Sequence, residues 1–392
     1  MARALFAWES GGDLGHARRS MQVAAALRGL GHEIAFAFSD LTPLAPLAGE
    51  RVEWFQAPVL APSRTPTRAP LNASAILVNR GFGDAAGLAG ALRAWKGLFA
   101  LWKPDLLVAE YAPCAMLGAR LAGLQRTAIG SGFSTPPRGE PMPVLRSWIA
   151  TDEGTLRHVD ATLLASVRDA CQRVDPRAAP PARAADLFEA DRELLCTWPE
   201  VDCFGPRSGV DYLGPQDDPA SGAHAEWGDG ARPRVFAYLK PRDPRFTAIL
   251  EALRAVAGEA IVAAPGLKPA AAAQFSSGSF RVHGEALAVG PLLAGADLCL
   301  CHSGPGIVAR ALEAGVPLAL LPQQLEQLLV GRRAVSAGAG VMLAPEEGVP
   351  DLKAWLAQAL ARDDLRHAAV ASPVRGRAPS SAAQRIAQSL EG

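Results

Sequence analysis

Short apolar strands alternate with helices along this chain, and glycine-rich turns join many of them. Residues 4–8 form an apolar run, which a turn at residues 9–16 follows. Apolar side chains then recur at helical spacing over residues 17–30, before a second apolar run at residues 33–38. A strand, a helix and a further strand in this order predict a parallel sheet, because parallel neighbours are joined by a helical crossover.

A second set of strands and helices follows a stretch without periodicity. Residues 216–233 are rich in Asp, Gly, Pro and Ala, which is typical of an interdomain linker. We therefore predict an N-terminal Rossmann-like domain over residues 1–215 and a C-terminal one over residues 234–374. Residues 375–392 are predicted to form a helix that packs back toward the N-terminal domain. The expected fold class is α/β, with two doubly wound domains facing each other across a cleft.

The composition argues against several classes of protein. The formal net charge is zero, whereas a nucleic-acid binder carries a basic surface, so we expect no nucleic-acid partner. The N-terminus lacks a basic segment before a long apolar one, and no run of about 18 apolar residues occurs. A cytoplasmic location is predicted, while peripheral membrane contact and oligomeric state stay open. The heavy use of Ala and Gly is typical of a GC-rich bacterial genome.

The cysteines are scattered and indicate reduced thiols in a cytosolic protein rather than a disulfide framework. Cys299 and Cys301 precede His302, and two thiols at this spacing share one face of a strand. No second pair of ligands follows at zinc spacing, so we expect no metal site there.

The strongest functional signal is the turn at residues 302–306, where a strand ends and a helix begins. Backbone N–H groups at a helix start, together with the helix dipole, form an anion site. Gly304 and Gly306 let the backbone approach a phosphate closely, and His302 can donate a hydrogen bond to it. An ordinary strand-to-helix turn is the simpler interpretation of a Gly-x-Gly alone, and only a longer pattern favours phosphate binding.

That longer pattern is present. The sequence His302-x-Gly-x-Gly306 is followed by Gly315-Val-Pro317, by Pro322 and by Glu326-Gln327. It resembles the donor-binding signature of GT-B glycosyltransferases related to the UDP-glycosyltransferases and the bacterial antibiotic, macrolide-type glycosyltransferases. Other segments that resemble this family are Val282–Asp297, Gly11–His16, Gly31–Glu33 and Tyr212–Pro215.

The resemblance implies an inverting glycosyltransferase that moves a sugar from a nucleoside-diphosphate sugar to an acceptor hydroxyl. His302 and the amides of Ser303, Gly304 and Gly306 would hold the phosphates, and Glu326 and Gln327 would face the sugar hydroxyls. His283 lies near the expected nucleobase segment. For Glu326 and Gln327, a solvated helix start is the alternative interpretation.

The resemblance also implies that the enzyme needs no metal and no cofactor beyond the nucleotide sugar. The sequence contains no Asp-x-Asp, so helix termini and cations would have to neutralise the departing diphosphate. Relatives usually carry Ser or Thr where Ile307 stands, and a Gly followed by Ser or Thr where Lys240-Pro-Arg242 stands. Many plant relatives carry a ribose-binding Glu at Arg310. Arg310 or Arg242 could contact phosphate, and surface charge is the equal alternative.

Three residues are candidates for the chemistry on the acceptor. His16 ends the Gly-rich turn after the first strand and is the expected general base, with a helix-start residue as the alternative interpretation. The resemblance implies that an acid at the end of a later strand orients this base. Here that residue is Glu110, which follows the strand predicted at residues 105–109, unless it is only an acid on the surface. Asp13 is the second choice of base.

The acceptor is expected to be a small molecule or a lipid-linked compound, bound by the loops at residues 57–82 and 131–149. Trp148, Phe133, Arg64, Arg68 and Arg80 are candidates to line its site, although most of them fit ordinary loop surface equally well. The sequence does not choose between UDP, dTDP and GDP sugars.

Two rival functions share the fold. A catalytically silent nucleotide-sugar binder that acts with a partner chain is favoured by Ile307 and Arg310. A nucleotide-sugar 2-epimerase would need acidic groups around the sugar and no acceptor.

Overall fold

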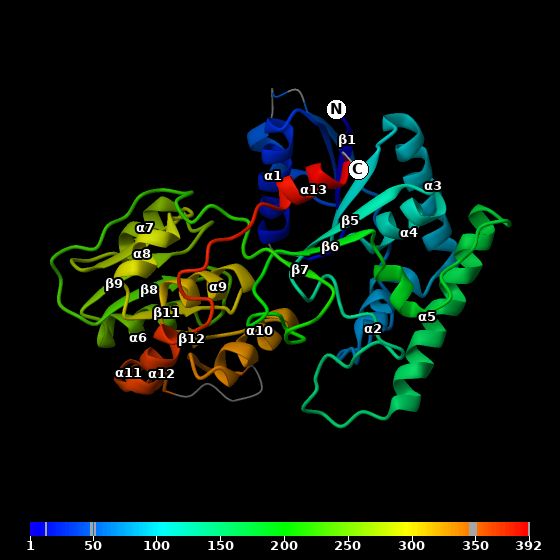
Figure 1. Ribbon diagram of the computed structural model, residues 1–392. Helices are drawn as coiled ribbons and strands as arrows, with labels where there is room; N and C mark the ends of the chain where they lie inside the picture. Colours follow the sequence, from blue (N-terminus) through cyan, green and yellow to red (C-terminus); the bar gives the residue numbers. More distant parts are fainter. Residues whose placement is uncertain (12–13, 48–49, 51, 345–350, 391–392) are drawn as a thin grey trace. The chain divides into compact units, whose positions relative to one another are not determined.

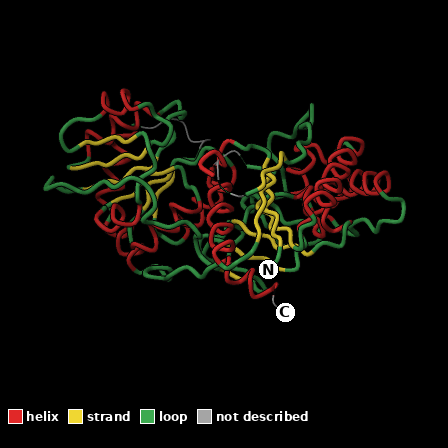
Figure 2. The backbone as a smooth tube through the Cα atoms, turned by 90° about the horizontal axis from the view of Figure 1, so that it is seen from above, coloured by secondary structure: helices red, strands yellow, loops and turns green. Residues whose placement is uncertain are grey.

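The computed structural model describes residues 1–11, 14–47, 50, 52–344 and 351–390. The chain forms two compact units, which are described separately. The first unit contains residues 1–196, 207–216 and the chain from Ser380 onward. The second contains residues 197–206 and 217–379. In each unit taken by itself, helices flank a central group of strands (Figure 2).

The first unit is built on a seven-stranded sheet in the order β3-β2-β1-β4-β5-β6-β7. Neighbouring strands are parallel throughout, so the predicted doubly wound topology is confirmed. Its strands are β1 (Arg3–Trp8), β2 (Glu33–Phe38), β3 (Glu53–Gln56), β4 (Leu106–Glu110), β5 (Gln125–Gly130), β6 (Arg192–Leu195) and β7 (Asp211–Tyr212). Its helices are α1 (Leu14–Gly29), α2 (Ala73–Leu77), α3 (Ala85–Trp102), α4 (Pro113–Leu121), α5 (Glu153–Val174) and α13 (Ala382–Leu390), with short turns η1 (Thr42–Leu47), η2 (Val78–Phe82) and η3 (Ala184–Phe188).

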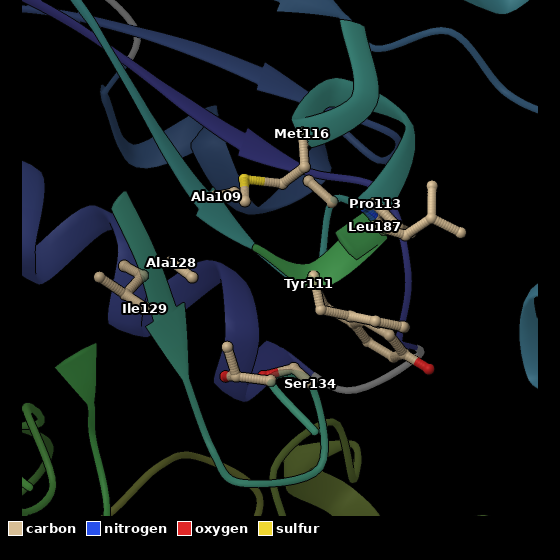
Figure 3. A pocket seen from close by; sticks show the side chains of 11 residues that line it. Ala109, Tyr111, Pro113, Met116, Ala128, Ile129, Ser134 and Leu187 are labelled. Atoms are coloured by element: carbon tan, nitrogen blue, oxygen red, sulfur yellow. The ribbon is translucent and has the colours of Figure 1, made fainter. Parts of the chain in front are cut away.

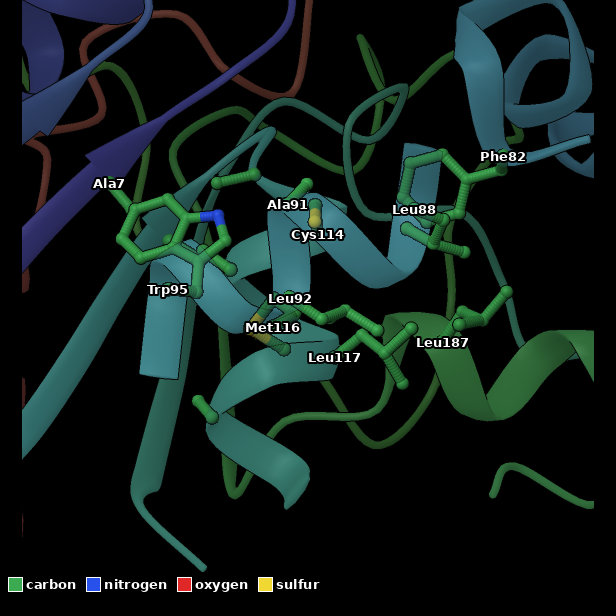
Figure 4. Packing of buried hydrophobic residues seen from close by; sticks show 14 of the residues in the cluster. Ala7, Phe82, Leu88, Ala91, Leu92, Trp95, Cys114, Met116, Leu117 and Leu187 are labelled. Atoms are coloured by element: carbon green, nitrogen blue, oxygen red, sulfur yellow. The ribbon is translucent and has the colours of Figure 1, made fainter. Parts of the chain in front are cut away.

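The central strands are apolar on both faces because helices cover both. Successive side chains of a strand point to opposite faces. Leu5 and Ala7 of β1 therefore pack in the core formed with α3, α4 and α5, where Trp95 is completely buried (Figure 4). Phe6, on the other face, packs in the core that contains Ile386 of α13. The C-terminal helix α13 lies beside α1 (Figure 1).

Between residues 73 and 102 the chain forms α2, η2 and α3, with a kink at Gly81. Gly81 has a φ of 99°, and a Cβ at this position would lie 2.4 Å from the carbonyl oxygen of Ala61. A glycine is therefore required where the loop before α2 crosses the kink. Asn79 holds the same loop, since its side chain accepts a hydrogen bond from the amide of Thr67 and donates one to the Thr67 carbonyl.

The second unit repeats the topology with six parallel strands in the order β10-β9-β8-β11-β12-β13. Its strands are β8 (Arg234–Tyr238), β9 (Glu259–Ala263), β10 (Phe280–His283), β11 (Leu298–Cys301), β12 (Leu318–Leu320) and β13 (Gly340–Met342). Its helices are α6 (Phe246–Val256), α7 (Pro269–Phe275), α8 (Val289–Gly295), α9 (Pro305–Ala314), α10 (Leu325–Ser336), α11 (Leu352–Ala361) and α12 (Asp363–Val370).

Two segments outside the predicted second domain pack within this unit. In the predicted linker, Trp227 donates a hydrogen bond from Nε1 to the carbonyl of Leu292 at 3.0 Å. In the segment 197–206, expected in the first domain, Trp198 donates to Glu313 at 2.6 Å and joins the second core. The physical reason is the same in both places, because each segment carries an indole that is stabilised by burial.

Within the described residues, no helix has the length and apolar character needed to cross a bilayer.

Candidate functional site

The first candidate site lies in the first unit, at the carboxyl edge of its sheet. β1 and β4 are neighbours, and Trp8 at the end of β1 is paired with Glu110 at the end of β4. The chain continues from β1 toward β2 on one side and returns to β4 on the other. This is the switch point at which doubly wound sheets bind ligands. From the sequence we expected Glu110 to follow this strand, whereas in the structure it is the last residue of β4.

His16 and Glu110 come together at this edge. His16 lies in the first turn of α1, and its Nδ1 atom is 2.8 Å from Oε1 of Glu110. The Glu110 carboxylate is completely buried, and His16 is 9% exposed. A carboxylate at Nδ1 fixes the tautomer of the ring and leaves Nε2 to accept a proton.

Arg19 shares the same carboxylate. It follows His16 by three positions on α1, and its Nη1 atom donates to Oε2 of Glu110 at 2.8 Å. Burial alone would raise the pKa of Glu110, but the charge of Arg19 and the hydrogen bond and charge of His16 outweigh that effect. The pKa of Glu110 therefore lies below its ordinary value, and the group is a carboxylate at neutral pH.

Two aromatic rings and a glycine lie next to the ring of His16. It stacks on Trp8 at 6.3 Å between ring centroids and lies 6.1 Å from the ring of Tyr111. Gly11 has a φ of 98°, and a Cβ there would lie 2.5 Å from Nε2 of His16. Glycine at position 11 therefore permits the turn and leaves room at the nitrogen that would receive the proton. Asp13, the second choice of base, lies outside the described residues.

A pocket opens next to Tyr111 and encloses about 310 Å³, its open mouth included (Figure 3). Its lining carries no charged side chain and consists of Ala109, Tyr111, Ala112, Pro113, Met116, Ala128, Ile129, Ser134, Thr135, Leu187 and Phe188. The hydroxyls of Ser134 and Thr135 both donate to the carbonyl of Ser131, at 3.1 and 3.2 Å. Each hydroxyl has a single hydrogen, so toward a ligand these two groups act as acceptors.

The predicted acceptor-lining residues differ in their surroundings. Phe133 packs edge-on against Tyr111 at 6.1 Å, close to His16. Trp148 is 40% exposed. Arg64, Arg68 and Arg80 are exposed on or beside the loop that Asn79 holds.

The second candidate site lies in the second unit, at the carboxyl edge of β8, β11 and β12. Cys301, the last residue of β11, is paired with Tyr238 on one side and Leu320 on the other. The three strands therefore end together. The turn at residues 302–304, the loop at residues 239–245 and the loop at residues 321–324 meet at one edge.

His302 is 4% exposed, and its Nδ1 atom is 2.9 Å from the carbonyl oxygen of Leu321. A carbonyl only accepts, so Nδ1 carries the hydrogen. Nε2 is buried and has no hydrogen-bond partner among the described residues. Burial lowers the pKa of His302 below its ordinary value, against the opposing effects of the Leu321 hydrogen bond and of Asp243, which lies 3.7 Å away.

The turn after His302 has the backbone of an anion site. Ser303 has a φ of 58°, in the left-handed region, and Gly304 precedes the first helical residue of α9. A left-handed residue at a helix start turns successive N–H groups toward one point. A Cβ on Gly304 or Gly306 would meet nothing closer than 3.8 Å, and neither residue has a positive φ. Their glycine character is therefore not required by the fold itself.

The other predicted donor residues are spread over the same sheet. Glu326 is half-buried in the first turn of α10. Gln327 is buried, and its Oε1 atom accepts a hydrogen bond from the amide of Gln323 at 2.9 Å. His283 ends β10, which β9 and β8 separate from β11. Burial lowers the pKa of His283.

Arg310 is buried in α9 and is held by two carboxylates. Its Nη1 atom donates to Glu313 at 2.8 Å, and its Nε atom lies 3.4 Å from Asp217. A cation held in this way is poorly placed to bind phosphate. Lys240 and Arg242 belong instead to the loop beside His302, where Asp243 is paired with Arg245 at 3.0 Å. The charge of Lys240 contributes to lowering the pKa of His302.

Cys299 and Cys301 are buried in β11, and their contact and burial raise the pKa of the Cys299 thiol well above its ordinary value. Among the described residues, no group of three or more His, Cys, Asp and Glu side chains is arranged to hold a metal ion.

Comparison with known proteins finds a family model that matches part of the chain and solved structures of similar fold. The family described as "Erythromycin biosynthesis protein CIII-like, C-terminal domain" matches residues 247–391. The spinosyn rhamnosyltransferase SpnG is 18% identical, with a TM-score of 0.67 over 100% of both chains. The glycosyltransferase VinC, solved with dTDP, is 16% identical, with a TM-score of 0.65 over 99% of this chain and 98% of that one. SsfS6 of Streptomyces sp. SF2575, solved with thymidine diphosphate, is 19% identical, with a TM-score of 0.62 over 100% of both chains.

The chain has the GT-B fold of the antibiotic glycosyltransferases. The predicted resemblance to that group is thereby confirmed, and the predicted class, a nucleotide-sugar-dependent glycosyltransferase, is the class of these structural neighbours. Among curated proteins, no sequence matches this GT-B chain significantly.

Two partly buried charged residues of the GT-B chain were missed in the sequence. Arg19 carried no signal beyond its position three residues after His16. Glu9 follows β1 directly, and its carboxylate accepts hydrogen bonds from the indole of Trp95 and from the amides of Cys114 and Ala115, at 2.7–2.9 Å. It thus caps α4 and holds the start of the turn that leads to His16. Burial raises the pKa of Glu9 to about 7, although the three N–H groups lower it.

Proposed function

We propose that this chain is an inverting glycosyltransferase that transfers a sugar from a nucleoside-diphosphate sugar to an acceptor hydroxyl. The observation that carries the proposal is the 2.8 Å contact between Nδ1 of His16 and the buried carboxylate of Glu110. A hydroxyl is a poor nucleophile at neutral pH, and a histidine with a fixed tautomer removes its proton as the new bond forms. In this proposal His16 is the general base and Glu110 orients it.

The acceptor is proposed to bind in the first unit, beside His16 and Tyr111. SpnG has been solved with spinosyn aglycone, which favours a small-molecule acceptor. The uncharged lining of the pocket beside Tyr111 supports a small-molecule acceptor with an apolar part.

The donor is proposed to bind in the second unit, with its diphosphate at the turn 302–306. The left-handed Ser303, the start of α9 and the buried Nε2 atom of His302 support this site. SpnG, VinC and SsfS6 have each been solved with thymidine diphosphate, which favours a dTDP sugar as the first donor to test. Glu326 and Gln327 are proposed to face the sugar, and His283 to lie nearer the base.

The transfer is proposed to need no metal, because fixed positive groups are available for the departing diphosphate. Those groups are the partial positive charge at the N-terminus of α9 and the cation Arg242 in the loop after β8. Arg310 is not counted among them, since Glu313 and Asp217 hold it.

The test is transfer by the purified protein, with dTDP and UDP sugars and a panel of hydroxylated acceptors, in the presence of EDTA. The product is detected by mass spectrometry, and the configuration at its anomeric carbon by NMR. A product that keeps the donor's configuration, or activity that EDTA abolishes, would contradict the inverting or the metal-independent part.

A catalytically silent binder remains the second candidate, because Ile307 supplies no hydroxyl at the start of α9. Nucleotide-sugar binding without transfer or hydrolysis would favour it. Epimerised donor formed without acceptor would instead select the epimerase. A cytoplasmic location and a bacterial origin remain predictions from the sequence.

A further inference from the structure

We propose that the loop around residues 57–82 binds an anionic group of the acceptor, a carboxylate or a phosphate, through Arg64, Arg68 and Arg80. These three residues are called the arginine cluster below. The inference rests on the proposed function and deepens it, because it names the chemical class of the acceptor. The arginine cluster determines specificity in this proposal and takes no part in the proton transfer at His16.

The loop that carries the arginine cluster begins at the edge of the sheet where His16 and Glu110 meet. It follows β3, and β3, β2, β1 and β4 are parallel neighbours in that order. Because the carboxyl ends of parallel strands lie at one edge of a sheet, the loop starts at the edge where the acceptor hydroxyl would be activated. An acceptor bound beside His16 therefore shares its edge of the sheet with this loop.

Asn79 gathers the three arginines through hydrogen bonds to their neighbours in the chain. The amide of the residue before Arg64 donates to the carbonyl of Asn79 at 2.9 Å. The residue before Arg68 donates its amide to Oδ1 of Asn79 at 2.9 Å, and its carbonyl accepts from Nδ2 at 2.8 Å. Arg80 follows Asn79 directly. Consecutive Cα atoms are about 3.8 Å apart, so the backbones of all three arginines lie close to one point.

The end of the loop is fixed as well. Asp160 of α5 is buried, and its carboxylate accepts hydrogen bonds from the side chains of Asn72 at 3.0 Å and Ser74 at 2.6 Å. Arg146, in the second predicted acceptor loop, donates from Nη1 to the carbonyl of Pro70 at 3.1 Å. A loop that is already held in place loses little conformational entropy when a ligand binds to it.

The positive charge of the arginine cluster is not paired within the part of the chain that the structure describes. Residues 54–83 contain these three arginines and no Asp or Glu. All three are exposed, and among the described residues their side chains form no ion pair and no hydrogen bond. Arginine stays protonated at every working pH. Three positive charges thus stand together at the acceptor edge of a chain whose net charge is zero.

The chemistry of arginine indicates the ligand. A guanidinium binds the oxygens of a carboxylate or a phosphate through two parallel N–H groups. The pocket beside Tyr111 has an uncharged lining and suits an apolar part of the same molecule. The inferred acceptor therefore has a hydroxyl for His16, an apolar part near Tyr111 and an anionic group for the arginine cluster.

The first test compares two acceptors, 6-hydroxy-2-naphthoic acid and its methyl ester, with dTDP-glucose and UDP-glucose as donors. The two probes share the ring and the reacting hydroxyl and differ by one negative charge. At low salt, KM of the wild type should be roughly fivefold to tenfold lower for the acid, the combined effect of exposed ion pairs, with a similar kcat. The difference should shrink between about 0.01 M and 1 M salt, because the Debye length falls from about 30 Å to 3 Å.

The second test removes the charges. The triple variant Arg64→Gln, Arg68→Gln and Arg80→Gln should give equal KM values for the acid and the ester. Its kcat, its KM for the ester and its nucleotide affinity should stay at the wild-type values, because the residues are exposed and distant from the reacting atoms in this proposal. Lysine at the same three positions keeps the charge and should retain most of the preference for the acid.

A single variant on another surface is the matched control. Arg177 is exposed and follows the C-terminal end of α5, whereas the loop contacts α5 through Asp160 in its N-terminal half. Arg68→Gln should lower the preference for the acid, and Arg177→Gln should leave it unchanged. Equal effects of the two variants would show that only the total charge of the protein matters, and would overturn the site.

The remaining outcomes separate this inference from the proposed function. Equal KM values for acid and ester in the wild type, or a preference that the triple variant keeps, would overturn the anion site alone. Arginines that serve a membrane would instead make the wild type sediment with phosphatidylglycerol vesicles and not with phosphatidylcholine vesicles, without a preference for the acid. That result would also overturn the site.

Absence of transfer to both probes while nucleotide still binds would defeat the proposed function. Binding of the probes, followed by their naphthalene fluorescence, then decides the anion site by itself. Tighter binding of the acid than of the ester by the wild type, lost in the triple variant, would support the site, and equal binding of both probes would overturn it.

Discussion

His16 and Glu110 lie 94 positions apart in the sequence, and their side chains meet at 2.8 Å. Parallel pairing of β1 with β4 brings them together, since both strands end at the same edge. Arg19 holds the other carboxylate oxygen, so Glu110 balances two groups at once. Removing the Glu110 carboxylate would change both the orientation of His16 and the charge beside Arg19.

Glu110→Ala is therefore expected to cost stability as well as rate. It leaves Arg19 without its buried partner, which typically costs about 3–5 kcal/mol. The loss should be smaller in Glu110→Ala combined with Arg19→Met, which removes both charges. Chemical denaturation measures this, and additive losses in the double variant would contradict a shared pairing. In the folded fraction, kcat should fall less for Glu110→Ala than for His16→Ala.

Nucleotide affinity should depend on the protonation of His302. Nδ1 donates to Leu321, so Nε2 donates to a phosphate only when the ring is protonated. The pKa of the free ring lies below 6.5, and a bound diphosphate would raise it. Affinity for dTDP should therefore increase as the pH falls through the bound pKa, and level off below the free pKa. Calorimetry across this range measures the effect.

His302→Ala should remove this pH dependence and weaken binding by roughly 1.5–3 kcal/mol, the range for a hydrogen bond to a charged group. Unchanged affinity in the variant would take the turn 302–306 out of the donor site.

Gly306→Ala separates the needs of the fold from those of the ligand. A Cβ at this position meets only Asp217, at 3.9 Å, so the folded chain has room for it. Alanine in a helix is favoured over glycine by up to about 1 kcal/mol, so thermal stability should stay the same or rise. Affinity for dTDP should fall, because the Cβ occupies the space a phosphate would approach. Wild-type affinity in a stable variant would contradict the phosphate site.

Glu9 is expected to make stability depend on pH. Its pKa rises from 4.5 to about 7 on folding, so its contribution is complete below pH 4.5 and is lost as pH rises through 7. The free energy of unfolding should therefore fall between about pH 5 and pH 8. Glu9→Gln keeps one acceptor oxygen but cannot titrate, and its slope over this range should be smaller. Equal slopes would show that other groups control the pH dependence.

The sequence predicted the sheets and their binding edges because strand, turn and helix are local patterns. It also predicted His16 and Glu110 as a pair, because the resemblance to GT-B glycosyltransferases implies a histidine that is oriented by an acid at the end of a later strand. Arg19 could not be found in this way, because an arginine on a helix is usually solvated. Only the packing of α1 on β1 and β2 brings it to Glu110 at the end of β4.

The position of a chain segment in one unit or the other depends on single buried side chains. Trp198 and Trp227 pack their segments against the core of the second unit, although the sequence around each of them predicts a loop. The guanidinium of Arg310 is likewise held by Asp217, which lies 93 positions away in the sequence. Such contacts join residues far apart in the chain and leave no periodic pattern.

The central claim is that His16 is the general base of sugar transfer. The most direct measurement compares kcat for transfer to 2-naphthol from a dTDP or UDP sugar in the wild type and in His16→Ala, with nucleotide affinity measured alongside. The account predicts a loss of roughly 10²–10⁴ in kcat, with nucleotide affinity unchanged. Near-full turnover by His16→Ala would contradict the account.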